Sequence, residues 1–215
     1  MSALIRKELR LAMHPAAVSF LLLSALLLVP NYPYYVTFFY TALGVFFICM
    51  GGRENKDIEF SLLLPVGKRD VVFVRFFTVI LLEVSQFLLA IPFAVIRSHL
   101  PVPPNAVGIE ANIAFFGLSF LLLGVFHLVF FEIYYKNTQK VGKAFIWGSA
   151  AMFLFITAAE TAVHAVPFCR DCLDTADPLF WKEKLAVLAI GILGYALLTL
   201  FAYRRAVGHF EKMDL

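Results

Sequence analysis

Residues 111–131 read ANIAFFGLSFLLLGVFHLVFF and contain no Lys, Arg, Asp or Glu. A helix of about 20 apolar residues crosses the hydrocarbon core of a bilayer, which is about 30 Å thick. A helix that is apolar all round is typical of a membrane span, because a soluble protein would have to bury every face of it. We therefore predict a transmembrane helix here, and the number of similar runs decides the fold.

The composition agrees with a membrane protein. The chain has 61% hydrophobic and 15% charged residues and a mean hydropathy of +0.85, whereas soluble domains have roughly 45–50% and 25%. These values exclude an ordinary soluble domain. The 215 residues allow six crossings with short connections and leave no room for a separate soluble domain.

The remaining apolar runs complete an all-α integral membrane protein with a single transmembrane domain over residues 1–215. Residues 2–13 carry apolar side chains on one helical face and Arg6, Lys7 and Arg10 on another, which indicates an N-terminal helix lying at the membrane interface. Pro30 and Pro33 mark the first turn. The predicted spans are residues 11–29, 34–50, 71–96, 111–131, 144–166 and 185–203.

The distribution of positive charge predicts the orientation. One side of the membrane holds the N-terminus, the loops 51–75 and 132–143, and the tail, and with them 14 of the 18 Lys and Arg residues. Because positive charge favours the cytoplasmic side, we expect a multi-pass protein of the cell membrane with both termini in the cytoplasm. The loops 98–110 and 167–183 then face outward.

The largest polar excursion lies between the second and third predicted spans. It carries acids at Glu54, Asp57 and Glu59, and its apolar residues Ile58, Leu62 and Leu63 share one helical face. This pattern predicts a short amphipathic helix on the cytoplasmic surface. An ordinary solvated loop is the alternative interpretation.

Three stretches resemble the small six-helix permeases of the type-2 exporter group of ABC transporters. LIRKELR at residues 4–10 is similar to their N-terminal elbow helix, and FEKMDL at 210–215 is similar to their common ending. More specific is ENKD at 54–57, followed by LLLPVGKRDVV at 62–72, which resembles the E-x-x-K … S-L-P-V-S-R-x-x-I-V stretch of their first cytoplasmic loop. This chain has Gly67 where that group usually has Ser, so the turn is expected without a hydroxyl cap.

The resemblance implies a membrane-spanning subunit that moves a peptide or hydrophobic compound outward. Its protein partners would be an ABC ATPase subunit and either a second copy of the chain or a similar permease. It would also contact the lipid bilayer, and no nucleic acid is expected as a partner. ATP and Mg would bind the ATPase, because this chain has no G-x-x-x-x-G-K-[ST] motif and no cofactor of its own is expected. In such permeases the loop forms a coupling helix that docks on the ATPase, here residues 54–64. The implied coupling residues are Glu54, Asn55, Lys56, Asp57, Ile58, Glu59, Leu62, Leu63 and Pro65.

Ionisable residues inside predicted spans are further candidates, because they usually face a cavity or each other. Glu83 and Gln86 would either line a substrate path or bond neighbouring helices. His127 alone is typical of a satisfied core residue, and Glu160 with His164 could form a pair on one helical face.

Cys169 and Cys172 lie in a loop expected outside the membrane, where disulfides persist. A local disulfide and two free thiols both remain open. No set of metal ligands is predicted.

Two other functions compete with the permease. A substrate-capturing module of a vitamin-type importer also has about six helices, but it lacks a coupling helix of this kind. An intramembrane enzyme would need a catalytic motif, and the chain contains neither H-E-x-x-H nor G-x-S-x-G. We therefore predict a transport subunit rather than an enzyme.

Overall fold

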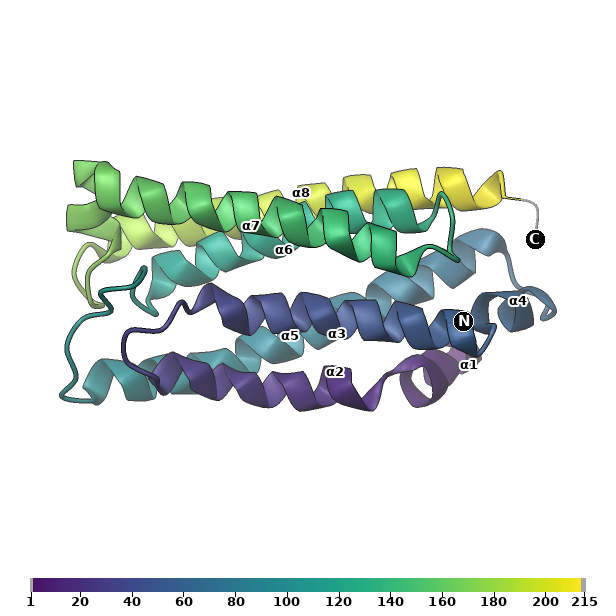
Figure 1. Ribbon diagram of the computed structural model, residues 1–215, viewed down its shortest axis with the longest axis horizontal. Coiled ribbons are helices and arrows are strands. Elements are labelled where there is room, and N and C mark those ends of the chain that lie inside the picture. Colours follow the sequence, from purple (N-terminus) through teal and green to yellow (C-terminus); the bar gives the residue numbers. More distant parts are fainter. Residues whose placement is uncertain (1, 214–215) are drawn as a thin grey trace.

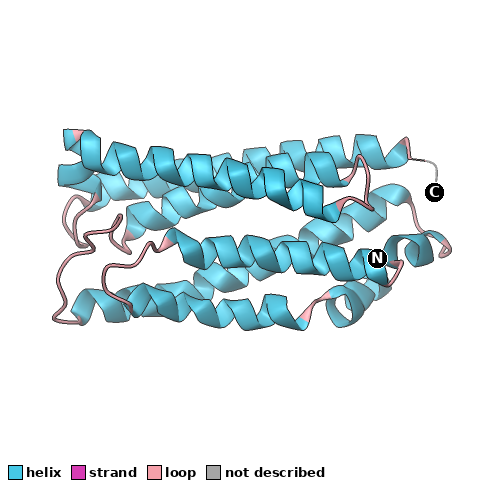
Figure 2. Cartoon of the chain, viewed as in Figure 1, coloured by secondary structure: helices cyan, strands magenta, loops and turns pink. Residues whose placement is uncertain are grey.

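The long helices run side by side along the longest axis of the molecule (Figure 1). The computed structural model describes residues 2–213 and contains helices and loops but no strand within them (Figure 2). The predicted all-α membrane fold is confirmed, because five helices are long and apolar enough to cross a membrane and a bent N-terminal pair raises the number to six. The last two residues of the tail motif lie outside the described residues. The five long helices are α3 (Tyr35–Glu54), α5 (Lys68–His99), α6 (Ile113–Tyr134), α7 (Val141–Ala165) and α8 (Trp181–Glu211).

The N-terminal segment is sharply bent. Helix α1 (Ser2–Lys7) and the π-helical turn η1 (Glu8–Ala12) form a helix over the range predicted to lie at the membrane interface, and the chain then turns by 79°. The next stretch consists of α2 (Pro15–Phe20) and the 3-10 helix η2 (Leu21–Leu28). Its start is fixed by the ring Nδ1 of His14, which accepts a hydrogen bond from the backbone N–H of Ala16 at 3.1 Å.

The helical stretch from Pro15 to Leu28 is therefore shorter than the range of 11–29 predicted for the first span. Pro15 occupies the first helical position, where its missing N–H costs nothing and its fixed φ suits a helix start. The apolar run gives no sign of this boundary, because Leu11, Ala12 and Met13 are as apolar as the span itself. The other five predicted ranges each overlap one helix, and most of these helices extend beyond the apolar run.

The helices pack in two groups. One group consists of α2, η2, α3 and α5, and the other of α6, α7 and α8. Contacts of α5 with α8 and of α3 with α7 join the two groups. Phenylalanines pack both between and within the groups. Between them, the ring of Phe76 in α5 lies 4.2 Å from that of Phe131 in α6. Within the first group, the ring of Phe38 in α3 lies 4.6 Å from that of Phe87 in α5.

Helices α6 and α8 form the tightest pair. A Cβ atom added to Gly191 of α8 would overlap with the carbonyl group of Gly117 in α6, and one added to Gly117 would come within 2.6 Å of the carbonyl oxygen of Val187. Small residues at such crossings let two backbones approach closely, which strengthens van der Waals packing where the hydrophobic effect between helices is weak. The two helices are therefore in direct backbone contact.

Both termini of the described chain lie at the same end of the bundle, together with the short helix α4 (Asp57–Leu62) (Figure 1). We call this the α4 end. The opposite end, formed by the loops that connect η2 to α3, α5 to α6 and α7 to α8, is called the distal end.

Candidate functional site

Helix α4 begins after an abrupt reversal of the chain. Helix α3 ends at Glu54, Asn55 is its C-cap, and Lys56 has a positive φ of 51°. A left-handed residue directly after a helix end is a common stop signal, although Gly is the usual residue there. Glu54, Asn55 and Lys56 therefore belong to the end of α3 and the turn. The predicted helix 54–64 is corrected to Asp57–Leu62.

The return to α5 is a turn with a side-chain cap. Pro65 and Gly67 lie in the turn, and the backbone N–H of Gly67 donates to the carboxylate of Asp70 at 3.2 Å. Asp70 is in the first turn of α5. The absence of the usual Ser therefore leaves the turn intact, because the cap comes from Asp70 rather than from position 67.

The outer surface of this segment is apolar at its tip. Phe60, Leu63 and Leu64 are exposed, Leu63 to 83%. Leu62 and Glu59 are half-buried, while Ile58 packs into the core. The sequence pattern predicted that Ile58 and Leu63 share one helical face, and it did not identify Phe60 as an exposed apolar residue. We call Phe60, Leu63 and Leu64 the apolar tip, and the polar residues Glu54, Asn55 and Lys56 lie exposed in the preceding turn.

Asp57, predicted to face a partner, instead lies inside the protein. It is 9% exposed, and its Oδ2 lies 2.7 Å from Nη2 of Arg75 in α5. Its other oxygen pairs with Lys7 of α1. Asp57 is buried rather than exposed because α1 and α5 lie close together. Lys7 of α1 and Arg75 of α5 both use its carboxylate as a counter-ion.

Four charged groups complete this arrangement, which we call the inner ion cluster: Lys7, Glu8, Asp57 and Arg75. Glu8 Oε1 lies 2.6 Å from Nε of Arg75. This contact is an ion pair rather than a well-directed hydrogen bond. Arg75 Nη1 also donates to the carbonyl oxygen of Ile48 at 3.2 Å. The cluster has two positive and two negative charges, so each buried charge has a counter-ion.

The inner ion cluster connects four elements. Lys7 and Glu8 come from α1 and η1, Asp57 from α4 and Arg75 from α5, while the Arg75 bond to Ile48 reaches α3. Sequence reasoning did not pair these residues, although the charged LIRKEL stretch and an arginine next to an apolar run were both visible.

A comparison with protein-family models supplies the classification. The model described as ABC-2 family transporter protein matches residues 3–205. The chain belongs to the ABC-2 transporter family. It is a membrane permease subunit of an ABC transporter and is not itself the catalytic subunit. No curated protein and no solved structure matches the chain.

In the middle of the permease a second polar cluster ties three helices together. Glu83 of α5 accepts a hydrogen bond from Tyr195 of α8 at 2.5 Å, and its Oε1 lies 2.8 Å from Nε2 of His127 in α6. The other ring nitrogen of His127 contacts Thr199 Oγ1 at 2.9 Å. We call these four residues the core polar cluster, and all of them are buried.

Of the two interpretations of Glu83 and Gln86, the contacts favour bonds between helices. Gln86 Nε2 donates to Ser24 Oγ of η2 at 2.7 Å, so it connects α5 to the first crossing. Neither Glu83 nor Gln86 lines the large cavity of the permease.

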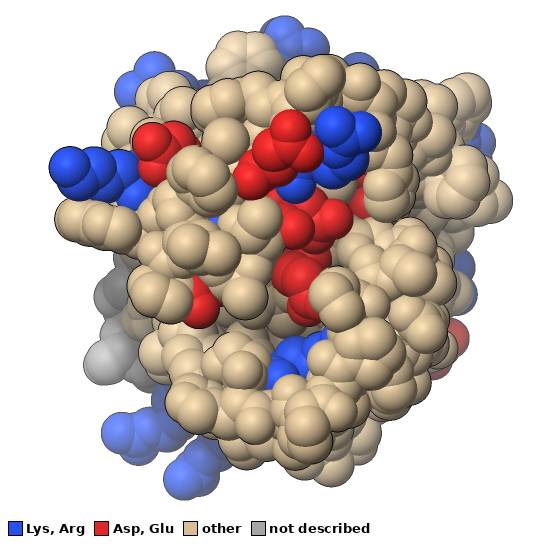
Figure 3. Space-filling view, turned by 90° about the vertical axis from the view of Figure 1, so that its left-hand side faces the viewer, with Lys and Arg blue, Asp and Glu red and all other residues tan. Residues whose placement is uncertain are grey.

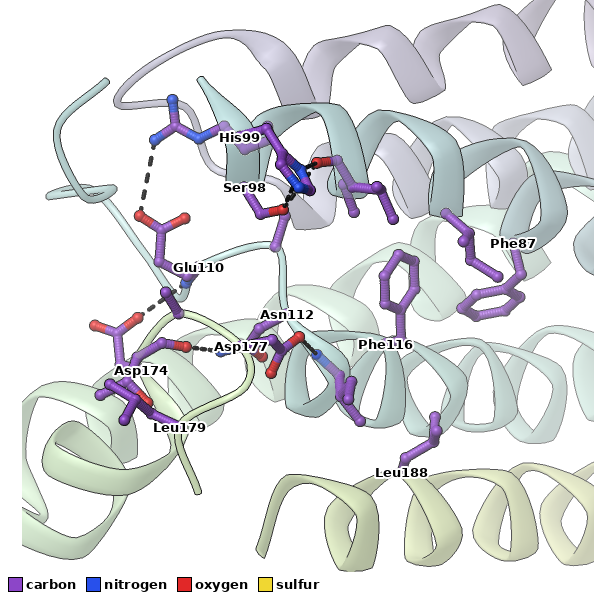
Figure 4. A pocket seen from close by; sticks show the side chains of 18 of the residues that line it. Phe87, Ser98, His99, Glu110, Asn112, Phe116, Asp174, Asp177, Leu179 and Leu188 are labelled. Carbon is purple, nitrogen blue, oxygen red and sulfur yellow. Dashed lines mark hydrogen bonds and ion pairs between the residues drawn. The ribbon is translucent and has the colours of Figure 1, made fainter. Parts of the chain in front are cut away.

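The large cavity opens at the distal end and has a volume of about 970 Å³. We call it the distal cleft. It lies between α5, α6 and α8, and Figure 4 shows polar side chains at one end and Phe87, Phe116 and Leu188 at the other. The rings of Phe87 and Phe120 stack at 3.7 Å between centroids and form part of its wall.

Carboxylates hold the loop between α5 and α6 at the mouth of the cleft. Asp174 accepts a hydrogen bond from the backbone N–H of Glu110 at 2.9 Å. Asp177 accepts one from the backbone N–H of Ile113 at 3.2 Å. Glu160 accepts one from the backbone N–H of Ile109 at 3.2 Å. Glu160 is thereby bonded to the loop, while His164 is 4.0 Å away. The predicted Glu160–His164 pair is therefore a weak contact.

Cys169 and Cys172 are both free thiols at the distal end. They lie in the π-helical turn η3 (Cys169–Leu173) and are half-buried. The disulfide that the sequence left open is not formed in this structure, and the alternative of two free thiols describes it.

Proposed function

We propose that the permease exports a peptide or a hydrophobic compound, driven by ATP hydrolysis on a separate ABC ATPase subunit that docks at the α4 end. The observation that carries this proposal is the apolar tip of α4. Phe60, Leu63 and Leu64 are exposed, and α4, which carries or adjoins them, lies at one extreme end of the bundle (Figure 1). Apolar side chains at the centre of a contact, with polar residues around them, are typical of a protein–protein interface.

The orientation expected from the charges supports this assignment. The α4 end has 14 of the 18 Lys and Arg residues, counted over the N-terminus, the loops 51–75 and 132–143, and the tail, and this excess is typical of the cytoplasmic side. An ATPase is available on that side of the membrane. ATP and Mg would bind that partner.

The inner ion cluster supplies a route from the docking site into the bundle. A partner that moves α4 also acts on Asp57, which is paired to Arg75 in α5 and to Lys7 in α1. Buried ion pairs are costly to separate, because each charge left alone would lack its counter-ion. We infer that α1, α4 and the start of α5 move together. Asp57 would then act through Arg75 rather than by contacting the ATPase.

We further expect the permease to act with a second copy or a similar permease. In the single chain, only 22% of the residues in the apolar 18-residue stretch of α7 are buried, and the same share holds for α8. Lipid or another helix bundle must cover this surface.

The test is to reconstitute the permease with its ABC ATPase and to measure ATP hydrolysis and ATPase binding. Replacing Phe60 and Leu63 together by Ser should abolish stimulation of hydrolysis and weaken binding at least tenfold, because apolar anchors commonly dominate interface energies. Arg204→Ala is the matched control, since Arg204 is exposed at the same end of the molecule.

Expression and elution profile should be unchanged in the double variant, because both side chains are exposed. Normal stimulation by the Phe60/Leu63 double variant would refute docking at the apolar tip. ATP-independent ligand capture by the isolated chain, with no response to any ATPase, would instead favour the importer-type module.

A further inference from the structure

We propose that the distal cleft binds an amphiphile with a cationic head group, whose apolar tail lies along α5, α6 and α8 and whose head group lies beside Asp174. This inference concerns binding alone and goes beyond the proposed function. It does not depend on the ATPase or on the docking site at α4.

The dimensions of the cleft suit an apolar chain. Its lining residues on α5 run from Val84 to His99, a rise of about 22 Å at 1.5 Å per residue. Half of a bilayer core is about 15 Å thick. The cleft volume of about 970 Å³ is at the upper end of the range for sites that hold small molecules.

The wall of the cleft is apolar along most of this length. Leu88, Ile91 and Val95 of α5 line it, as does Ile192 of α8, and each of these side chains is more than 40% exposed. The exposed residues give a tail direct access from the bilayer. Phe87 and Phe120 bound the cleft near the middle of the molecule.

The mouth of the cleft is acidic. Glu110, Asp174 and Asp177 line it, with Arg97 as the lining residue of opposite charge. Figure 3 shows acidic side chains gathered near the middle of this face, beside a hollow. Two of these acids already have counter-ions: Asp177 pairs with Lys184 at 3.1 Å, and Glu110 lies 3.7 Å from Arg97.

Of these three acids, Asp174 is the one that forms no ion pair within 4.0 Å among residues 2–213. Its Oδ1 accepts from the backbone of Glu110, and its Oδ2 has no hydrogen-bond partner in the described chain. Partial burial raises the pKa of the Asp174 carboxyl above its ordinary value, although the backbone N–H of Glu110 and the more distant charges of His164 and Lys184 oppose the shift. A cationic group at this point would supply the missing charge at the polar end of an apolar cleft.

The experiment uses the full-length permease in phosphatidylcholine nanodiscs. The probe is a twelve-carbon alkyl trimethylammonium with a photoreactive diazirine near the tail end. The same tail with a neutral hydroxyl head group is the comparison. Crosslinked peptides are mapped by mass spectrometry, and probe concentrations are corrected for partition into lipid.

We expect saturable labelling of the α5 and α8 residues that line the cleft, with the cationic probe about three- to tenfold tighter than the neutral one. Asp174→Asn should remove this difference while keeping the bond to Glu110. Asp171→Asn is the matched control, because it changes the net charge equally at the same end, yet Asp171 is paired with Arg170 outside the cleft.

A second pair of variants tests the tail site. Ile192→Trp should fill the cleft and lower the labelling about tenfold, whereas Ile190→Trp, on the same helix but outside the lining, should not. Equal affinity of the cationic and neutral probes, an equal effect of Asp171→Asn, or labelling that misses the cleft would each overturn the proposal. The comparison of the two probes on the unaltered protein needs no variant to fold.

Discussion

Arg75 and Asp57 are joined by an ion pair of 2.7 Å, and both side chains are buried. This pair fastens the short helix α4 to the long helix α5. Asp57 is therefore part of the internal framework, whereas Glu54, three residues earlier, is exposed at the end of α3. Two acids that look equivalent in the sequence are predicted to behave differently.

Removing Asp57 should destabilise the permease. Asp57→Ala leaves Arg75 with Glu8 alone and Lys7 without its carboxylate, and breaking a buried pair in this way typically costs about 3–5 kcal/mol. Glu54→Ala, the matched control, should be close to neutral. Thermal unfolding of the purified proteins, followed by loss of the elution peak, measures both. Equal stability of the two variants would contradict the internal position of Asp57.

The core polar cluster should contribute stability within the membrane. Glu83→Ala leaves Tyr195 and His127 without their acceptor, and we expect a loss of about 1–3 kcal/mol, whereas Glu83→Gln should lose less. Ser85→Ala is the control, because Ser85 bonds its own helix at Leu81. Unfolding in increasing sodium dodecyl sulfate gives the comparison. A neutral Glu83→Ala variant would show that these bonds are energetically unimportant.

The contact between α6 and α8 predicts a strong effect of a single methyl group. Gly191→Ala would drive the new Cβ into the backbone of Gly117, and such overpacking typically costs about 1–3 kcal/mol. Gly208→Ala on the same helix has open space and should be neutral or slightly stabilising. The midpoint of thermal unfolding distinguishes them, and similar midpoints for both variants would argue against the close approach.

The predicted orientation can be tested by labelling single cysteines in a background that lacks Cys49, Cys169 and Cys172. Ala106→Cys at the distal end should react with an impermeant maleimide added to intact cells, while Lys140→Cys at the α4 end should react after lysis. Both positions are exposed, so access depends on the side of the membrane. Labelling of position 140 but not of 106 in intact cells would reverse the orientation.

The spans were predictable because each requires one property, an apolar run of sufficient length. Residues 111–131 illustrate this, and α6 covers Ile113–Tyr134. The start of the first crossing was not predictable from hydropathy. It depends on His14 and Pro15, which cap and begin a helix inside a continuous apolar stretch.

The polar contacts were less predictable than the helices, because they join distant parts of the chain. Glu83 and His127 were both recognised as unusual within spans, yet the distance of 2.8 Å between them depends on how α5 packs on α6. Asp57 was assigned to the surface because local amphipathicity cannot show that Arg75 and Lys7 approach it. The distal cleft was not predicted, since its apolar lining residues resemble lipid-facing ones.

Helix α5 is anchored at Arg75 by the inner ion cluster and again at Glu83 by the core polar cluster. These anchors divide it into unequal arms. Arg75 is about 12 Å from Glu83 along the helix axis, and His99 is about 24 Å beyond it. If Glu83 acts as a fulcrum, a tilt that shifts the Arg75 end moves the far end about twice as far, in the opposite direction. Because that far arm forms one wall of the distal cleft, a small displacement at α4 would then produce a larger change in cleft width.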